Sequence, residues 1–207
     1  MSAPMPETVF TVGHSTHPPE RFLALLCQHE ITAVCDVRSR PYSGYSPQFN
    51  REALEQALRE AGIKYVFLGK ELGARSGDRS CYERGKVQYD LIARTELFRQ
   101  GIERVRDGME KGFRVALMCA EAEPLECHRT ILVARHVAAS GIQVQHIHAD
   151  GSLESQGAAL DRLRDNLRLP ERDLFRTRED VLDDAYRLQG DRIAYALDEA
   201  SVTSAGG

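Results

Sequence analysis

One short stretch of the chain gathers several side chains that can take part in covalent or acid–base chemistry. In chain order they are Cys119, Glu121, Cys127, His128 and Arg129. A thiol that lies beside a cationic side chain or near a helix N-terminus has a lowered pKa, which makes it a better nucleophile. An imidazole next to it can accept or supply a proton near neutral pH. The stretch therefore predicts a catalytic centre with Cys127 or Cys119 as its reactive thiol.

Apolar segments elsewhere in the sequence predict the elements that must position these side chains. Short runs rich in β-branched and apolar residues, as expected for buried strands, occupy 9–12, 31–37, 63–68, 113–119 and 142–147. Helical patterns separate these runs, and the alternation favours βαβ units with a parallel sheet. We therefore expect an α/β fold in which a mostly parallel, open sheet of about five strands is flanked by helices.

Most of the predicted strands run directly into titratable or hydroxyl-bearing residues. These residues are His14 and Ser15, Asp36 and Arg38, Cys119 and Glu121, and His146 and His148. In an open parallel sheet the strands end at one edge, and ligands bind in the crevice there. We therefore expect these side chains to surround one hollow, together with the helix that begins near Cys127.

The residue types at this edge indicate an enzyme that acts on a small anionic, nucleotide-like substrate. The candidate catalytic residues are Cys127, His128, Cys119, Glu121 and His14, and the candidate substrate-binding residues are Ser15, Asp36, Arg38, Arg129 and Tyr42. Guanidinium groups bind phosphate and carboxylate through paired hydrogen bonds, and a helix N-terminus adds further donors. We therefore expect Arg38 and Arg129 to hold the anionic group.

A second interpretation is a non-catalytic module that binds a nucleotide, a nucleic acid or a partner. Its cysteines would be structural, because recognition of anions and bases needs only arginine and aromatic side chains. The residues in contact with the ligand would be Arg38, Arg129, Tyr42 and Tyr45.

A third interpretation is a protein stabilised by a metal ion, because cysteine and histidine are the usual zinc ligands. The donors would be Cys119, Cys127, His128 and His14. Against this, the spacing lacks a C-x-x-C pattern, and adjacent residues such as Cys127 and His128 rarely reach one ion. We therefore expect no metal ligand among the site residues, and the sequence leaves the cofactor open.

Composition and charge exclude several classes of protein. The 207 residues carry a formal net charge of -4, which argues against an extended nucleic-acid surface. No apolar run approaches the roughly 20 residues that cross a bilayer, so we expect no membrane span. Residues 1–7 lack the basic region and apolar core of a signal peptide, and five cysteines are an odd number for a disulfide scaffold. We therefore expect a cytoplasmic protein.

The sequence pattern changes after residue 150. We expect an α/β domain over 8–150 and a helical C-terminal extension over 151–207 that packs on it, with helices at 154–167 and 178–199 and no strand. Within the domain, the apolar spacing from 91 to 109 predicts one long helix. The glycine-rich segment 69–87 predicts a long surface loop, and loops of that length are usually functional.

Several short motifs occur in a fixed order along the chain. They are TVGHS at 11–15, DVR at 36–38, PQFN at 47–50, YVFLG at 65–69, LMCAE at 117–121 and CHR at 127–129. In this order they resemble the domain-of-unknown-function 488 family, and the pairing of CAE with CHR is the most specific part. The resemblance runs from about residue 8 to residue 150 and departs at GKELGAR, 69–75, where relatives read closer to Leu-Gly-Gly. It implies an α/β domain of bacterial or archaeal type with its signature residues at the strand ends, and it implies no particular reaction.

Overall fold

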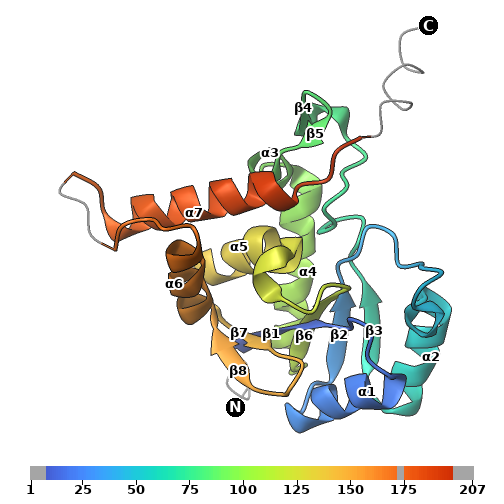
Figure 1. The fold of residues 1–207 in the computed structure, drawn as a ribbon. Coiled ribbons are helices and arrows are strands. Elements are labelled where there is room, and N and C mark those ends of the chain that lie inside the picture. Colours follow the sequence, from blue (N-terminus) through green and yellow to red (C-terminus); the bar gives the residue numbers. More distant parts are fainter. Residues whose placement is uncertain (1–7, 172–174, 198–207) are drawn as a thin grey trace, which may run out of the picture.

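A six-stranded sheet forms the centre of the computed structural model, which describes residues 8–171 and 175–197 (Figure 1). The strand order across this sheet is β3-β2-β6-β1-β7-β8. Its strands are β1 (Thr8–Gly13), β2 (Ala33–Asp36), β3 (Lys64–Phe67), β6 (Val115–Cys119), β7 (Gln143–Ile147) and β8 (Leu153–Ser155). The order makes β1 and β6 direct neighbours, although a long stretch of sequence separates them.

The sheet is parallel except at one edge. β1 pairs in parallel with β6 and β7, and β2 pairs in parallel with β3 and β6. These pairings confirm the expected α/β fold with a mostly parallel sheet. β8 pairs antiparallel with β7, so the expectation of no strand after residue 150 was wrong. With only three residues, β8 is too short to produce a recognisable alternating pattern.

Helices cover both faces of the sheet (Figure 1). They are α1 (Pro19–Gln28), α2 (Arg51–Glu60), α3 (Tyr89–Ala93), α4 (Glu96–Glu110), α5 (Arg135–Ala139), α6 (Gln156–Asn166) and α7 (Arg178–Ile193), with the shorter turns η1 (Pro47–Phe49), η2 (Arg79–Cys81), η3 (Pro124–Glu126) and the π-helical η4 (Arg129–Ala134). Successive side chains of a strand point to opposite faces. Phe10 accordingly packs with α1 and α2, whereas Val9 packs in the cluster that contains α4 and α5.

The segment between β3 and β6 contains more structure than the sequence predicts. The expected single helix over 91–109 is two helices, α3 and α4, because Thr95 separates them and its side chain accepts a hydrogen bond from the N–H of Phe98 as the N-cap of α4. The expected loop over 69–87 includes the antiparallel hairpin of β4 (Tyr82–Glu83) and β5 (Lys86–Val87). Arg84 and Gly85 connect these strands with positive φ angles, as two-residue hairpin turns require.

α6 and α7 pack over the start of the η4 helix, where their apolar side chains form a cluster with Leu125 and Ile131. α7 ends at Ile193, and the last residues of the helix expected over 178–199, 198 and 199, lie outside the described residues. No helix in the described part of the chain combines the length and the apolar character that crossing a membrane requires.

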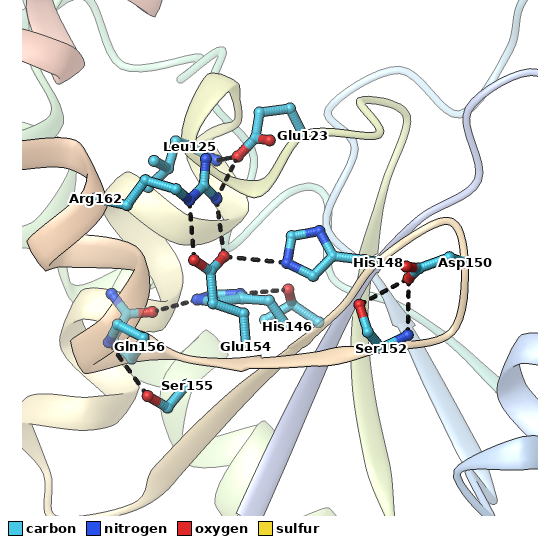
Figure 2. A network of polar contacts seen from close by, with 12 residues as sticks. Glu123, Leu125, His146, His148, Asp150, Ser152, Glu154, Ser155, Gln156 and Arg162 are labelled. Carbon is cyan, nitrogen blue, oxygen red and sulfur yellow. Dashed lines mark hydrogen bonds and ion pairs between the residues drawn. The ribbon is translucent and has the colours of Figure 1, made fainter. Parts of the chain in front are cut away.

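A buried polar network fastens α6 and α7 to the sheet. Figure 2 shows the part of it in which His146 meets Gln156. His146, which is fully buried in β7, accepts a hydrogen bond from Thr11 at Nδ1 and donates from Nε2 to Gln156 of α6, both at 2.8 Å. The amide of Gln156 donates in turn to the hydroxyl of Tyr186 in α7 at 2.7 Å. His146 therefore satisfies both of its ring nitrogens inside the fold and lies away from the candidate site.

Candidate functional site

β1 and β6 end side by side, and the hydrogen bonds between them continue into the loops that follow. The N–H of His14 donates to the carbonyl of Cys119 at 3.0 Å, and the N–H of Ser15 donates to that of Ala120 at 2.8 Å. These bonds fix the start of the loop that carries Glu121. They also place His14 beside Cys119, as expected if parallel strands end at one edge of the sheet.

Gly13 is the point of closest approach between these two loops. A β-carbon added there lies 1.8 Å from the carbonyl oxygen of Glu121. We expect Gly13→Ala to lower the free energy of unfolding by about 3 kcal/mol, because the overlap is with backbone and forces the loop to move. Urea denaturation measures this loss, with Gly157→Ala as the control, since a β-carbon at Gly157 meets nothing within 4 Å. A loss below about 1 kcal/mol would contradict this close approach.

Cys127 directly precedes the helical segment that begins at His128 and continues as η4. Its backbone is extended, with φ -137° and ψ 138°, and its carbonyl accepts hydrogen bonds from the N–H groups of Thr130 and Ile131. Its Sγ accepts a hydrogen bond from the N–H of Arg129 at 3.4 Å. The unpaired N–H groups of a helix start favour negative charge, so this position stabilises a thiolate.

Cys119, Glu121, Cys127 and His128 form a compact group, which we call the Cys/His/Glu cluster. The Sγ of Cys127 donates to the Oε2 of Glu121 at 3.0 Å. The Nδ1 of His128 lies 3.7 Å from the Sγ of Cys119 and 3.9 Å from the Sγ of Cys127. The Nε2 of His128 donates to the carbonyl of Val37 at 3.0 Å. This last bond requires a proton on Nε2 and leaves Nδ1 facing both sulfurs.

Within the cluster the pKa of Cys127 is lowered and the pKa of Cys119 is raised. Burial opposes ionisation of Cys127, but the adjacent Cys119, the charge of Arg129 and His128 lower its pKa well below the usual value. The adjacent Cys127 and burial raise the pKa of Cys119 well above that value. Burial and the charge of Cys127 also raise the pKa of Glu121. These shifts favour ionisation of Cys127 over ionisation of Cys119, next to a carboxyl group that can exchange a proton with the Cys127 thiol.

His128 has a pKa above its ordinary value, although its burial acts in the opposite direction. The contacts with Cys127, the charge of Glu121 and the hydrogen bond to Val37 all favour the protonated ring. An imidazole held in this way can donate a proton at near-neutral pH.

Asp36 and Arg38 form a second buried group at the end of β2. Asp36 is fully buried, and its carboxylate accepts from the Nε of Arg38 at 2.9 Å, from its Nη2 at 2.7 Å and from the hydroxyl of Tyr65 at 2.9 Å. The Nη1 of Arg38 donates to the Nε2 of His14 at 3.1 Å. The Nδ1 of His14 donates to the carbonyl of Ser15 at 2.9 Å. Burial, and then the nearby charge of Arg38, lower the pKa of His14 to about 4, so the ring is neutral.

Both groups border one cavity of about 600 Å³, within the size range of small-molecule sites. Of the residues expected at the site, those that line the cavity are His14, Ser15, Arg38, Tyr42, Cys119, Glu121, Cys127 and His128. Segments far apart in the sequence thus meet around a common hollow. Tyr45, which the binding-module interpretation includes, is fully exposed and is not part of the cavity wall.

Asp36 and Arg129 lie behind the cavity wall rather than in it. Arg129 is fully buried, and its guanidinium donates to the carbonyl of Glu121 at 2.5 Å and to that of Ala122 at 3.1 Å. These bonds hold the loop between β6 and η3. Neither residue is placed to touch a molecule in the cavity, so their role there is to position Arg38 and Glu121.

The cavity wall also includes residues that the sequence did not single out. They are mainly Arg40, Arg75, Tyr89, Ile193 and Tyr195. Arg75 belongs to the segment 69–87, whose length was itself a signal of function. Tyr195 follows α7, and no sequence signal connects it with the strand ends. The guanidinium of Arg75 lies 4.3 Å from the centre of the Tyr195 ring, so the two residues form one part of the wall.

The chain was compared with known families, curated proteins and solved structures. It matches the model of the family described as "Domain of unknown function DUF488" over residues 18–136. No curated protein and no solved structure matches it at a significant level. The family match covers more than half of the chain and contains the Cys/His/Glu cluster and the pair of Asp36 and Arg38. By this match the chain belongs to the DUF488 family, as the order of its motifs indicates.

Proposed function

We propose that this chain is a cysteine- and histidine-dependent enzyme that acts on a small anionic, nucleotide-like substrate. One observation carries the proposal: the Cys/His/Glu cluster, whose two thiols and imidazole are buried, lines the same cavity as several arginine and tyrosine side chains. Titratable groups with perturbed pKa values in a concave site are the usual mark of catalysis.

The charge of the cavity wall favours an anion. Arg38, Arg40 and Arg75 line the cavity from two different loops, against the carboxylates of Glu121 and Glu126. Arg38 is held in place by Asp36 and His14, whereas Arg40 and Arg75 are exposed. One guanidinium with a fixed position and two exposed guanidiniums can together bind a phosphate group, because a phosphate accepts several charge-assisted hydrogen bonds at once.

The aromatic side chains of the wall favour a base or another flat ring. Tyr42, Tyr89 and Tyr195 line the cavity together with the arginines. Stacking of a base on an aromatic ring contributes about 1–3 kcal/mol and tolerates different bases. An anionic group beside a flat ring is the chemistry of a nucleotide.

The Cys/His/Glu cluster supplies the reactive groups. In the proposed reaction a nucleophile activated in the cluster attacks an electrophilic centre of the substrate. Glu121 takes the proton of that nucleophile, and His128 gives a proton to the leaving group. Transfer of a proton from Glu121 to His128 through Cys127, which contacts both, then restores the starting protonation of the two side chains. We place this reaction in a reducing compartment such as the cytoplasm, and the free thiols of Cys27, Cys35, Cys81, Cys119 and Cys127 support that choice.

Calorimetric titration with nucleoside monophosphates tests the binding part of the proposal. The unphosphorylated nucleosides are expected to bind at least about tenfold more weakly, because they lack the charge-assisted hydrogen bonds. Arg40→Gln and Arg75→Gln should each weaken binding of the monophosphate by about tenfold. Arg59→Gln is the matched control, since Arg59 is exposed in α2 and lies outside the cavity wall. Equal affinities for nucleoside and monophosphate would overturn the proposal.

Turnover tests the catalytic part. The tightest-binding monophosphate is incubated with the protein and with the variants Cys127→Ser and Glu121→Gln, and products are separated by chromatography. Conversion by the unaltered protein alone supports the enzyme. Binding of the nucleotide without any conversion would instead establish the non-catalytic binding module.

A further inference from the structure

Three side chains of the Cys/His/Glu cluster direct a donor atom at the same point. The Sγ atoms of Cys119 and Cys127 and the Nδ1 of His128 all lie within 4.8 Å of one another. The three residues are at most 8% exposed, so their donor atoms are shielded from bulk water. No other group of His, Cys, Asp and Glu in the described residues converges in this way.

The distances between these donors match those around a tetrahedral zinc ion. Zinc binds sulfur at about 2.3 Å and nitrogen at about 2.1 Å, so tetrahedral coordination separates sulfur from nitrogen by about 3.6 Å and the two sulfurs by about 3.8 Å. The sulfurs of Cys119 and Cys127 lie 3.7 and 3.9 Å from the Nδ1 of His128. Small side-chain movements therefore suffice to bring all three donors into contact with one ion.

The backbone explains how adjacent residues reach the same point. Cys127 is extended, whereas His128 has helical angles of φ -59° and ψ -25°. The change of conformation between them turns both side chains toward Cys119. The sequence argument against a shared ion, that neighbours rarely bind together, therefore does not apply at this helix start.

The second ring nitrogen of His128 is held as it is in metal sites. Its Nε2 donates to the carbonyl of Val37 at 3.0 Å, and this bond fixes both the tautomer and the ring orientation. Metal-binding histidines usually make such a bond to a backbone carbonyl or a carboxylate. Nδ1 is thus directed at the two sulfurs before any ion binds, and it gives up any proton when a metal takes its place.

The charges of the site also suit a divalent cation. Two thiolates would neutralise a dication. The buried guanidinium of Arg129, which binds the main-chain carbonyl of Glu121, adds one positive charge to set against the carboxylate of that residue. A site whose charges sum to about zero loses less free energy when those charges are buried. The carboxylate of Glu121 lies 3.0 Å from the Sγ of Cys127 and is not one of the three converging donors.

We propose that Cys119, Cys127 and His128 bind a zinc ion whose fourth coordination position opens into the cavity. Three protein ligands with one open position are the arrangement of catalytic rather than structural zinc sites. A zinc ion held by these three residues would supply a Lewis acid that activates a water molecule, and Glu121 beside Cys127 would take the proton of that water and pass it to the leaving group. This catalytic role rests on the proposed function and makes the activated nucleophile a water and His128 a metal ligand in place of a proton donor, whereas metal binding itself does not depend on it.

Metal analysis of the purified full chain tests the inference without any substrate. We expect about one equivalent of zinc per chain after reconstitution and dialysis. Cobalt in place of zinc should give the intense visible bands of a tetrahedral ion and a thiolate charge-transfer band in the near ultraviolet. Cys119→Ser, Cys127→Ser and His128→Asn should each weaken metal binding by at least about a hundredfold.

Cys81→Ser is the matched control, because it also removes a buried thiol but lies outside the cluster. It should retain the metal and the cobalt spectrum. The spectrum of the unaltered protein decides the question even if a cluster variant fails to fold. Three results would each overturn the inference. They are cobalt bands without thiolate charge transfer, less than about a tenth of an equivalent of bound zinc, and a disulfide between Cys119 and Cys127 that persists in the presence of a reductant. Zinc binding without nucleotide binding would refute the proposed function alone, and nucleotide binding without zinc would refute this inference alone.

Discussion

Asp36→Ala is expected to lower the free energy of unfolding by about 3–5 kcal/mol, the usual loss when one partner of a buried ion pair is removed. The carboxylate is fully buried and accepts hydrogen bonds from the side chain of Arg38 and from the hydroxyl of Tyr65. Without it, a guanidinium that is 7% exposed keeps its charge and loses most of its partners. Equilibrium urea denaturation measures the loss.

Two further variants separate the ion pair from the rest of the network. Tyr65→Phe removes a single hydrogen bond to Asp36 and should cost about 1 kcal/mol. The double variant Asp36→Leu with Arg38→Met removes both charges together and should recover most of the stability lost in Asp36→Ala. If Asp36→Ala lowers the free energy of unfolding by no more than Tyr65→Phe does, the ion pair of Asp36 and Arg38 does not stabilise the fold at the end of β2.

Stability is expected to fall as the pH drops from about 6.5 to about 4. Burial lowers the pKa of both His14 and His146 to about 4, from 6.5 in the unfolded chain. Below pH 6.5 these two histidines therefore become protonated in the unfolded state, whereas in the native state they stay neutral down to about pH 4. This difference in bound protons favours unfolding. Each histidine contributes on the order of 3 kcal/mol at the acid end of this window. Urea midpoints measured across the window show the decrease.

His146→Asn isolates one of the two contributions. The variant should be less stable at neutral pH, because it disturbs the hydrogen bonds to Thr11 and Gln156. It should also lose roughly half of the dependence on pH between 6.5 and 4. His136→Asn is the control, since it replaces a half-buried histidine that does not belong to the network of Thr11, His146 and Gln156. An unchanged slope in His146→Asn would assign the acid sensitivity to other groups.

The elements of the parallel sheet could be predicted from the sequence mainly because its central strands β1, β2 and β6 are almost fully buried and largely apolar. Val34 and Leu117, for example, belong to continuous apolar runs, which local patterns detect well. The gathering of His14, Arg38 and Cys119 around one cavity follows from the rule that parallel strands end at one edge. Both arguments use only local sequence and the direction of the strands.

The remaining features depend on contacts that no local pattern records. Arg129 is fully buried because its guanidinium donates to two carbonyls of a neighbouring loop. The sequence does not show these long-range contacts, and the position of Arg129 beside Cys127 and His128 suggested a contact with a ligand instead. The two strands of the hairpin, β4 and β5, have two residues each. The place of Tyr195 in the cavity wall arises from long-range packing, because its carbonyl accepts a hydrogen bond from the N–H of Val87.

The segments that build the cavity have a consequence for how the family diversifies. The matched region, 18–136, includes the Cys/His/Glu cluster, whereas Ile193 and Tyr195 of the cavity wall lie beyond it. The cluster and part of the cavity wall are thus encoded in separate stretches of the gene. We expect that exchange of the C-terminal stretch between relatives would change the shape of the cavity and leave the Cys/His/Glu cluster in place.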